Sequence, residues 1–426
     1  MKRLIIFLVV ILCTHTFTRA FSQEYDFDIP VEEEPRIEFN GNLDAKWGML
    51  QTRKSSPFYG LQFYDDSEKS DYLSQYRLDF YLDGAYRHKQ VGLYMKTFYQ
   101  YAREEPLSPS FYELYGSLNI SPRWSMSIGK RRFNWGKGYA FNPVGYVNAE
   151  KDPENPDLAL AGKTSVYISY NRSFTSNFVQ NFSLGAIMLP PEAEINQKFA
   201  SADKIGAAIK LYCLLNNIDI DFMTVFKKDE PQRFGLDFST NLRENLEIHA
   251  EFSYAYDENI YRIVDDSIYH NKIDSNSYLI GLRYINRFNT TLITEYYRNK
   301  SGLSKNEFTS YVNYLQNSME SNIPELANSA KSNMSTYFRS KTLMKDYLYV
   351  KLIQPEPFSW LYTSISISTI YNLVDKSFLF SPQLSYKPYT NSEVLLWPIL
   401  FFGDNNTEYG SKQFEKKIEI WMRYYF

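Results

Sequence analysis

Residues 416–426 read KKIEIWMRYYF, and their side chains alternate strictly in character. Successive side chains of a β-strand point to opposite faces of the sheet, so a period of two residues indicates a strand. One face of this segment is apolar or aromatic, whereas the other carries charge. The first face comprises Ile418, Ile420, Met422, Tyr424 and Phe426, and the second Glu419, Trp421, Arg423 and Tyr425. The segment therefore predicts an amphipathic strand at the end of the chain.

The same alternation recurs upstream. Clear examples lie at residues 37–47, 76–83, 246–254, 277–284 and 361–368. In a soluble β-sandwich the apolar face of each strand would pack against a second sheet, and the polar face would meet water. In a transmembrane β-barrel the apolar face meets lipid and the polar face lines the lumen. Alternation by itself leaves both architectures open.

The first residues favour the membrane alternative. Lys2 and Arg3 precede the apolar run Leu4–Cys13, and small residues end the segment. This order predicts a cleaved secretory signal over residues 1–22, followed by a short acidic periplasmic lead-in at residues 23–35. Beyond the signal no apolar run approaches the length of about 18 residues that a transmembrane helix needs.

The chain is rich in aromatic residues and yet polar on average. It holds 37 Tyr, 31 Phe and 6 Trp, but its mean hydropathy is −0.42. Barrels combine these properties because only alternate residues face lipid and because aromatic girdles mark both membrane interfaces. Removing Lys2, Arg3 and Arg19 with the signal leaves 43 basic residues against 49 acidic ones. This acidic balance argues against a nucleic-acid partner.

Segments with strand character number roughly eighteen. They begin near residues 36, 71, 90, 110, 124, 164, 178, 204, 217, 232, 246, 276, 290, 346, 359, 377, 392 and 413. Every second connection between them is short, as at residues 88–90, 121–123 and 355–358. The others are mostly longer, at about 52–70, 134–163, 189–203, 257–274, 299–344 and 403–412, although those near 227–231 and 373–376 are short.

An even-stranded barrel with both termini in the periplasm has tight turns at one end and longer external loops at the other. We therefore predict an all-β fold, namely a single antiparallel transmembrane β-barrel over residues 36–426 with about 18 strands, within a range of 14 to 18. Within the external loop at residues 299–344, helical spacing of Phe308, Tyr311 and Leu315 predicts a helix at about 305–321.

Charged side chains on the polar faces are the candidates for the lumen wall. A water-filled lumen holds such charges without the cost of burial in lipid. Both signs occur, which gives no preference for anions or cations. The lumen-wall candidates are Arg77, Asp79, Glu251, Arg283, Glu295 and Arg423.

A Gly-Lys-Gly at residues 136–138 raises the question of a phosphate loop. Such a loop needs four residues between its first Gly and the Gly-Lys, and a Ser or Thr after the Lys. Here six residues separate Gly129 from Gly136, and Gly138 follows Lys137. The spacing therefore excludes a nucleotide site of this kind.

Other catalytic or metal-binding patterns are equally weak. His249 and Ser253 lie on one predicted strand, about 13 Å apart along its axis, so they cannot form a nucleophile–base pair. The acidic run at residues 150–157 lacks the ligand spacing and the glycine of a calcium loop. We expect no enzymatic activity, no catalytic residue, no metal site and no cofactor.

By the strand count, residues 131–162 form the third external connection. The segment SIGKRRFNWG contributes Gly129, Lys130, Trp135 and Gly136, FNPV contributes Asn142 and Pro143, and DLALAG contributes Leu158 and Gly162. This pattern resembles porin-like bacterial outer-membrane β-barrel families, especially alginate-export-type and related substrate-channel porins. The chain end at Tyr424 and Phe426 resembles the assembly signal of such barrels.

The resemblance implies that the third loop, at residues 134–163, folds into the lumen and narrows it. It then gives as candidates for the constriction Arg131, Lys137, Tyr139, Asn142, Lys151, Asp152, Glu154 and Asp157. Alginate channels are rich in lumen arginine, whereas this chain places many acidic residues on its polar faces. Alginate is therefore a poor fit as the solute.

We expect an outer-membrane channel of a Gram-negative cell that passes small polar or charged solutes by diffusion. Its expected partners are outer-membrane lipid and lipopolysaccharide, the barrel-assembly machinery and the small solutes, and assembly into a homo-oligomer is left open. The alternative is a non-conducting barrel that acts as a surface receptor, an adhesin or an export-complex component. The long loop at residues 299–344 would serve that alternative.

Overall fold

The computed structural model of this protein describes residues 35–64, 70–102, 105–156, 160–190, 205–228 and 230–426. The expected signal at residues 1–22, the lead-in up to residue 34 and the candidate Asp157 lie outside these described residues. The described chain forms one antiparallel sheet of 18 strands, which confirms the predicted strand number.

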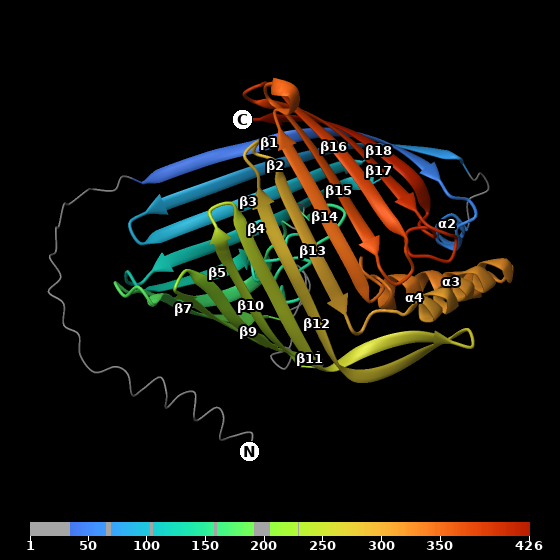
Figure 1. The fold of residues 1–426 in the computed structure, drawn as a ribbon, viewed down its shortest axis with the longest axis horizontal. Helices are drawn as coiled ribbons and strands as arrows, with labels where there is room; N and C mark the ends of the chain where they lie inside the picture. The colour runs from blue at the N-terminus through green and yellow to red at the C-terminus, as the bar shows by residue number, and fades with distance from the viewer. Residues whose placement is uncertain (1–34, 65–69, 103–104, 157–159, 191–204, 229) are drawn as a thin grey trace, which may run out of the picture. The chain divides into compact units, whose positions relative to one another are not determined.

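Each strand pairs with its neighbours in sequence, and β1 also pairs with β18, so the sheet closes into a barrel (Figure 1). The strands are β1 (Arg36–Thr52), β2 (Tyr72–His88), β3 (Val91–Ala102), β4 (Glu105–Asn119), β5 (Trp124–Arg131), β6 (Lys163–Ser173), β7 (Val179–Leu189), β8 (Gly206–Leu215), β9 (Ile218–Phe226), β10 (Gln232–Arg243), β11 (Leu246–Val264), β12 (Ser267–Ile285), β13 (Thr291–Asn299), β14 (Asp346–Pro355), β15 (Thr363–Asn372), β16 (Phe378–Tyr389), β17 (Ser392–Phe402) and β18 (Phe414–Tyr425). At the closure the Gly41 N–H donates to the Phe426 carbonyl at 3.0 Å. Closure satisfies the backbone groups that an open edge would expose to lipid.

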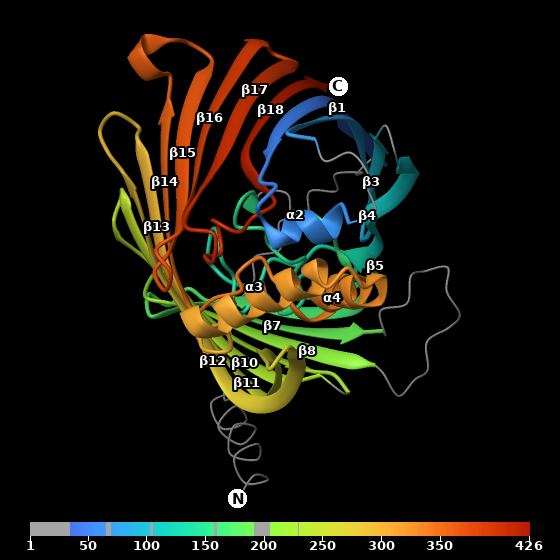
Figure 2. The same cartoon turned by 90° about the vertical axis from the view of Figure 1, so that its right-hand side faces the viewer.

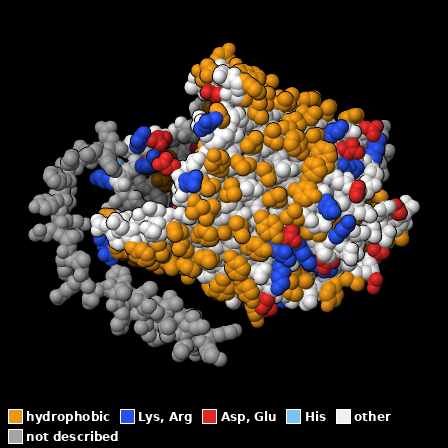
Figure 3. All heavy atoms as spheres, in the orientation of Figure 1, with side chains coloured by type: hydrophobic (Ala, Val, Ile, Leu, Met, Phe, Trp, Pro, Cys, Tyr) orange, Lys and Arg blue, Asp and Glu red, His pale blue; other side chains and the backbone are white. Residues whose placement is uncertain are grey.

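Buried and exposed side chains alternate along the strands. On β12 the side chain of Leu279 is fully buried, whereas the next residue, Ile280, is 59% exposed. On β13 the alternate residues Ile293, Glu295 and Tyr297 are all buried. On the face of the barrel that Figure 3 shows, apolar side chains cover the middle of the outer wall, and charged side chains gather mainly toward its two ends. The apolar face of the alternation therefore points outward and the polar face points into the barrel.

The two ends of the barrel differ in the length of their connections. At the end where β1 begins and β18 ends, strands join through short turns such as residues 89–90 and 216–217. Asn216 and Asn217 have φ angles of 48° and 62°, a left-handed conformation that asparagine tolerates in two-residue hairpin turns. The opposite end has long connections at residues 53–71, 132–162 and 300–345. The predicted asymmetry between the two ends is confirmed.

The lengths predicted for two connections are wrong. The long loop expected at residues 257–274 does not exist, because β11 and β12 continue to a two-residue turn at Asp265 and Asp266 with φ angles of 48° and 53°. Figure 1 shows the far end of this hairpin extending past the neighbouring strands. The turn expected at residues 355–358 reaches residue 362, because Pro357–Ser359 forms a short 3-10 helix.

Three helices lie in the connections at the long-loop end (Figure 2). The predicted helix is present as α3 (Lys305–Glu320), which Ser304 and Glu307 cap reciprocally. The sequence interpretation missed α2 (Pro57–Gln62) and α4 (Pro324–Tyr337). Tyr311 of α3 contacts the other two helices. Its ring lies 5.8 Å from the ring of Phe58 on α2 and 4.2 Å from that of Phe338, the C-cap residue of α4. Within the described residues, no helix has the length and apolar character needed to cross a bilayer.

Candidate functional site

We call the connection between β5 and β6 the inner loop (residues 132–162), and its residues 132–156 run inside the barrel (Figure 2). It leaves one wall and contacts the inward faces of strands on other parts of the wall. Glu251 on β11 is 2% exposed, and its carboxylate accepts the backbone N–H groups of Lys137 at 2.6 Å, Gly138 at 2.5 Å and Val144 at 3.3 Å. A single buried carboxylate therefore holds both ends of the segment 137–144.

A second carboxylate holds the middle of the same segment. Glu295 on β13 is fully buried and accepts the backbone N–H groups of Tyr139, Ala140 at 2.9 Å and Phe141 at 3.4 Å. His249 lies 3.1 Å from the same carboxylate through its Nε2 atom. Hydrogen bonds to an ionised acceptor are stronger than neutral ones, and they satisfy a carboxylate that burial would otherwise penalise. We call Glu251 and Glu295 the acid anchors.

The charged side chain of the inner loop binds a third part of the wall. The Nζ atom of Lys137 lies 3.1 Å from Asp221 on β9 and 3.9 Å from Asp237 on β10, and both carboxylates are fully buried. Lys210 on β8 lies 3.1 Å from the same Asp221 oxygen. Burial opposes the charge of Lys137, but the charges of Asp221 and Asp237 raise its pKa above the ordinary value. Lys137 is therefore a fixed cation inside the barrel.

Apolar contacts complete the attachment on two sides. Toward β7, β8 and β9 the loop packs one hydrophobic cluster against the wall, comprising Phe133, Trp135, Val144, Val147, Ile187, Leu189, Ala208, Met223 and Val225. Toward β13 the ring of Phe141 stacks on Tyr297 at 4.8 Å. Toward β14 the ring of Tyr139 stacks on Tyr349 at 5.9 Å, and its hydroxyl accepts from Lys351 at 2.6 Å. The loop is thus attached to the inner wall at β7 to β9 and again at β13 and β14.

The Gly-Lys-Gly of the sequence has a structural explanation. Gly136 has a φ of +89°, and a Cβ atom there would lie 2.3 Å from Asn142 Oδ1 and 2.7 Å from Glu251 Oε1. At Gly138 a Cβ atom would lie 2.2 Å from the Phe141 carbonyl. Only glycine lets the backbone approach the acid anchor this closely. The Gly-Lys-Gly motif therefore lets the loop backbone bind the Glu251 carboxylate of the protein itself, and it does not bind a phosphate.

The constriction candidates do not converge on one point. Lys137, Tyr139, Asn142 and Lys151 all fasten the loop, and Lys151 donates to the Gly138 carbonyl at 2.5 Å. The other described candidates lie elsewhere. Arg131 lies between the rings of Tyr115 and Tyr167 at 5.4 and 5.0 Å, Asp152 lies 3.4 Å from Lys341, and Glu154 lies 3.8 Å from Lys412. Arg131, Lys137 and Asp152 therefore face different partners.

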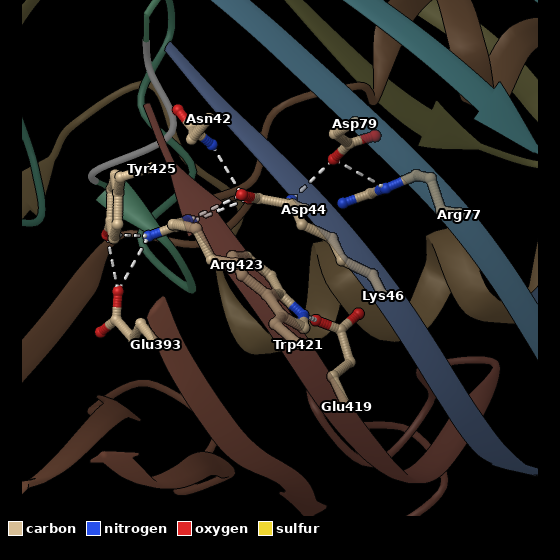
Figure 4. Close-up of polar contacts among 10 residues, drawn as sticks. All are labelled: Asn42, Asp44, Lys46, Arg77, Asp79, Glu393, Glu419, Trp421, Arg423 and Tyr425. Carbon is tan, nitrogen blue, oxygen red and sulfur yellow. Dashed lines mark hydrogen bonds and ion pairs between the residues drawn. The ribbon is translucent and has the colours of Figure 1, made fainter. Parts of the chain in front are cut away.

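The lumen-wall candidates separate into three places. Glu251 and Glu295 are the acid anchors, and Arg283 is exposed on β12. Arg77, Asp79 and Arg423 belong to a network of ion pairs where the first and last strands meet (Figure 4). We call it the seam network, and its members are Asp44, Lys46, Arg77, Asp79, Glu393 and Arg423.

The seam network links four neighbouring strands, β17, β18, β1 and β2 (Figure 4). Arg423 binds Asp44 through two nitrogens at 2.8 and 2.9 Å. Lys46 lies 2.6 Å from Asp79 and 3.8 Å from the centre of the Trp421 ring. The sequence interpretation omitted Asp44 and Lys46 from the wall, although both lie on the polar face of the segment 37–47. The alternation of polar and apolar residues in this segment could have identified both as lumen-facing.

The histidine and serine considered above as a catalytic pair both bind other residues of the protein. His249 contacts Glu295, whereas the Ser253 hydroxyl lies 2.8 Å from the Tyr146 hydroxyl of the inner loop. Over the described ranges, no group of three His, Cys, Asp or Glu side chains is arranged to hold a metal ion.

A cavity of about 340 Å³ lies beside the inner loop, and we call it the outer cavity. Its walls come from loop residues 140–153, from the inward faces of β10 to β13, and from residues 340–342 after α4. It lies toward the long-loop end, because Asn299 is the last residue of β13, and Ser301 and residues 340–342 belong to the long connection that follows it.

Comparison with known proteins places the fold. No known protein family matches the sequence, and no curated protein sequence matches it either. Among solved structures, the chain is similar to a BenF-like porin from Pseudomonas fluorescens Pf-5, at 9% identity, with 92% of this chain and 98% of that chain covered and a TM-score of 0.55. It is also similar to Pseudomonas aeruginosa OccK2 (OpdF) in complex with glucuronate, at 10% identity over 91% of this chain and 96% of that one, with a TM-score of 0.53.

A third similar structure is Pseudomonas aeruginosa OprD, at 8% identity over 92% of this chain and 95% of that chain, with a TM-score of 0.51. At such low identity these similarities show a shared porin-like barrel fold and nothing finer. They lend no support to the alginate-export subtype that the motif resemblance suggested.

Proposed function

We propose that this protein is an outer-membrane porin, a channel through which small polar or charged solutes diffuse without chemical change. The observation that carries the proposal is a closed barrel with an apolar outer wall and an inner wall of ion pairs, crossed inside by a firmly attached loop. Lipid requires the first property and water the second. The porin-like fold of the similar structures supports the same function.

The inner loop is the proposed constriction. A loop held by two buried carboxylates keeps a constant position, and a constant aperture is what separates solutes by size and charge. The exposed parts of the candidate residues, among them Arg131, Asp152 and Glu154, would border the remaining passage. Lys137 and Tyr139 would act by positioning the loop.

The proposed location is the outer membrane of a Gram-negative cell, with the end where β1 begins and β18 ends in the periplasm. Residues 1–22 would serve as the signal, and the chain end from Tyr424 to Phe426 would be read by the barrel-assembly machinery. The ring of Phe426 stacks on Phe80 at 5.9 Å, so this end is also part of the closed wall. Lipid and lipopolysaccharide would surround the apolar wall, and no cofactor is proposed.

Liposome swelling tests the channel. Liposomes with the folded barrel should swell in iso-osmotic solutions of small sugars and amino acids, and the rate should fall as solute size grows. Liposomes with the same amount of heat-unfolded protein provide the matched control. Equal rates in both preparations would contradict the proposal.

One observation favours the second candidate, a barrel that binds a partner at its surface. On α4 and its N-cap, Ile323, Leu326 and Tyr337 are 46%, 47% and 39% exposed at the long-loop end. The variant with Ile323→Ser and Leu326→Ser should lose partner or cell-surface binding with solute flux unchanged if this candidate holds. Unchanged binding would exclude this helix as the docking surface, and the exposed Glu325→Ser is the control substitution.

A further inference from the structure

The outer cavity has the dimensions and walls of a small-molecule site. Its volume of about 340 Å³ lies at the lower end of the range for such pockets, roughly 300–1,000 Å³. The inner loop forms one wall, and β10 to β13 form the facing wall. A solute that enters the barrel from the long-loop end therefore meets this cavity beside the inner loop.

Neutral hydrogen-bonding groups dominate the lining. Six hydroxyl side chains face the cavity, namely Ser253, Ser275, Ser277, Ser301, Ser340 and Thr342. Three carboxamides, Asn142, Asn148 and Asn299, join them. Several of these groups already donate to protein atoms, as Ser277 does to Asn299 and Ser340 to the Thr342 carbonyl, so they offer a ligand chiefly the remaining acceptor capacity of their oxygens. Groups of this kind match a ligand whose own groups are hydroxyls.

The charges in the lining are compensated by the protein itself. Arg233 lies 3.0 Å from Glu258, and the Ser275 hydroxyl donates to the same carboxylate. Lys151 donates to the Gly138 and Tyr139 carbonyls at 2.5 and 3.1 Å. A charged ligand would have to displace one of these contacts before it gained a partner.

Lys341 is compensated by several acids together. It lies 3.4 Å from Asp152, and its side chain is 54% exposed. Burial alone would lower its pKa, but the negative charges of Asp152, Glu154 and Glu150 raise it above the ordinary value. The last cation of the lining, Lys163, also has an interaction partner of its own.

An apolar surface lies beside the polar one. Phe141 and Tyr297 both line the cavity, with their rings stacked at 4.8 Å and 17°. The C–H face of a sugar ring is apolar while its edge carries hydroxyls, so an aromatic wall next to serine and asparagine side chains suits both.

We propose that the outer cavity binds an uncharged, hydroxyl-rich solute of about the size of one sugar ring, before that solute passes the inner loop. The inference rests on the proposed channel and names the class of its solute. It separates this barrel from a passage that sorts solutes by size alone.

Equilibrium binding to the folded, detergent-solubilised full chain tests the site without any requirement for conduction. Titration calorimetry with glucose, glucuronate and glucosamine compares a neutral ring with an anionic and a cationic ring of similar size. Glucose should bind, and both charged rings should bind at least about tenfold more weakly, because each must desolvate a charge without an unpaired partner. Tighter binding of either charged ring, or no binding of glucose, would overturn the proposal.

Two serine substitutions locate the site. Ser277→Val on β12 removes one lining hydroxyl and should weaken glucose binding about fivefold, the effect of one lost hydrogen bond. Ser368→Val on β15 is the matched control, since Ser368 is a half-buried strand serine outside the lining. Equal affinities of the two variants would overturn the assignment of the cavity.

Charge substitutions test the compensation. Lys341→Met leaves the surrounding acids unbalanced and should raise glucosamine affinity, whereas Glu258→Gln frees Arg233 and should raise glucuronate affinity. Lys341 is exposed, so its substitution should not impair folding. If Lys341→Met binds glucosamine no more tightly than the natural protein does, the lining acids do not serve to neutralise Lys341. Glucose binding by a barrel that does not conduct would refute the channel alone, and conduction without glucose binding would refute this inference alone.

Discussion

The inner loop and the seam network are both held by buried carboxylates, but the carboxylates meet different partners. In the inner loop, Glu251 and Glu295 accept backbone N–H groups. In the seam network the carboxylates form ion pairs with side chains, chiefly Asp44 with Arg423 and Asp79 with Lys46. A backbone contact depends on the path of the chain, since residues as different as Ala140 and Phe141 donate to Glu295, whereas a side-chain contact requires a particular residue. The first kind of contact fixes a loop within a lumen, and the second ties strands together.

The largest effect should come from the acid anchors. The double variant Glu251→Gln and Glu295→Gln keeps the shape of both side chains but replaces one acceptor oxygen of each with an amide nitrogen that cannot accept. A buried N–H group left without its acceptor costs about 1–3 kcal/mol, so two such losses should weaken attachment of the loop by about 2–6 kcal/mol. Open-channel current noise should then rise sharply in single-channel recordings.

Glu247→Gln is the control for that variant, because Glu247 lies on the same strand with its side chain 33% exposed. Its current should remain quiet. A double variant as quiet as the natural protein would show that apolar packing alone holds the inner loop.

Gly136→Ala should have the next largest effect. A methyl group there would meet Asn142 and Glu251, and alanine at a φ of +89° is strained, so the loop should lose about 2–3 kcal/mol. Hydrogen exchange of the amides at residues 137–144 should become faster. Gly48→Ala on β1 is the control, since its Cβ atom would have no neighbour closer than 3.8 Å. Equal protection in both variants would contradict the close approach.

Arg423→Met should have a smaller effect, and on the wall rather than on the loop. Lys46 still lies 3.4 Å from Asp44, and Asn42 still donates to it, so the loss should be about 1–2 kcal/mol. The temperature at which the folded band disappears in gel electrophoresis should fall, while current noise stays at the natural level. Increased noise without reduced thermal stability would reverse the roles of the two regions.

A pH effect in the long loops should be the smallest. Glu408 between β17 and β18 is 4% exposed, and burial raises its pKa above the ordinary value despite the opposing charge of Lys412. The folded protein therefore binds this proton more tightly, and packing of these loops should loosen as pH rises from the ordinary glutamate range through the raised pKa. Limited proteolysis should be faster at pH 8 than at pH 5, and Glu408→Gln should reduce that difference. Equal rates in the natural protein would contradict it.

The difference between the two regions also explains what could be predicted. The strands β1, β5, β10, β11, β14 and β17 begin where period-two alternation placed them, because a closed barrel with lipid on one side enforces that period at every strand. The polar face of the segment 37–47 likewise contained Asp44 and Lys46. Contacts made by side chains on regular strands leave a pattern in the sequence.

Contacts made by the backbone leave a much weaker pattern in the sequence. Nothing in the spacing of Glu251 or Glu295 indicates that loop amides bind them, and Gly136 and Gly138 suggested a nucleotide site until spacing excluded it. The constriction candidates dispersed for the same reason, since the path of the inner loop decides which partner each side chain meets. The hairpin of β11 and β12 ran longer than expected because Asp265 and Asp266 make a tight turn that composition alone does not distinguish from a loop.

Single-channel recording in a planar bilayer tests the central claim most directly, namely that the barrel is a water-filled channel narrowed by a firmly attached inner loop. The folded natural protein should give discrete conductance steps with low open-channel noise, and the acid-anchor double variant should give larger and noisier steps. A barrel that is folded and inserted but gives no conductance step in either form would contradict the claim.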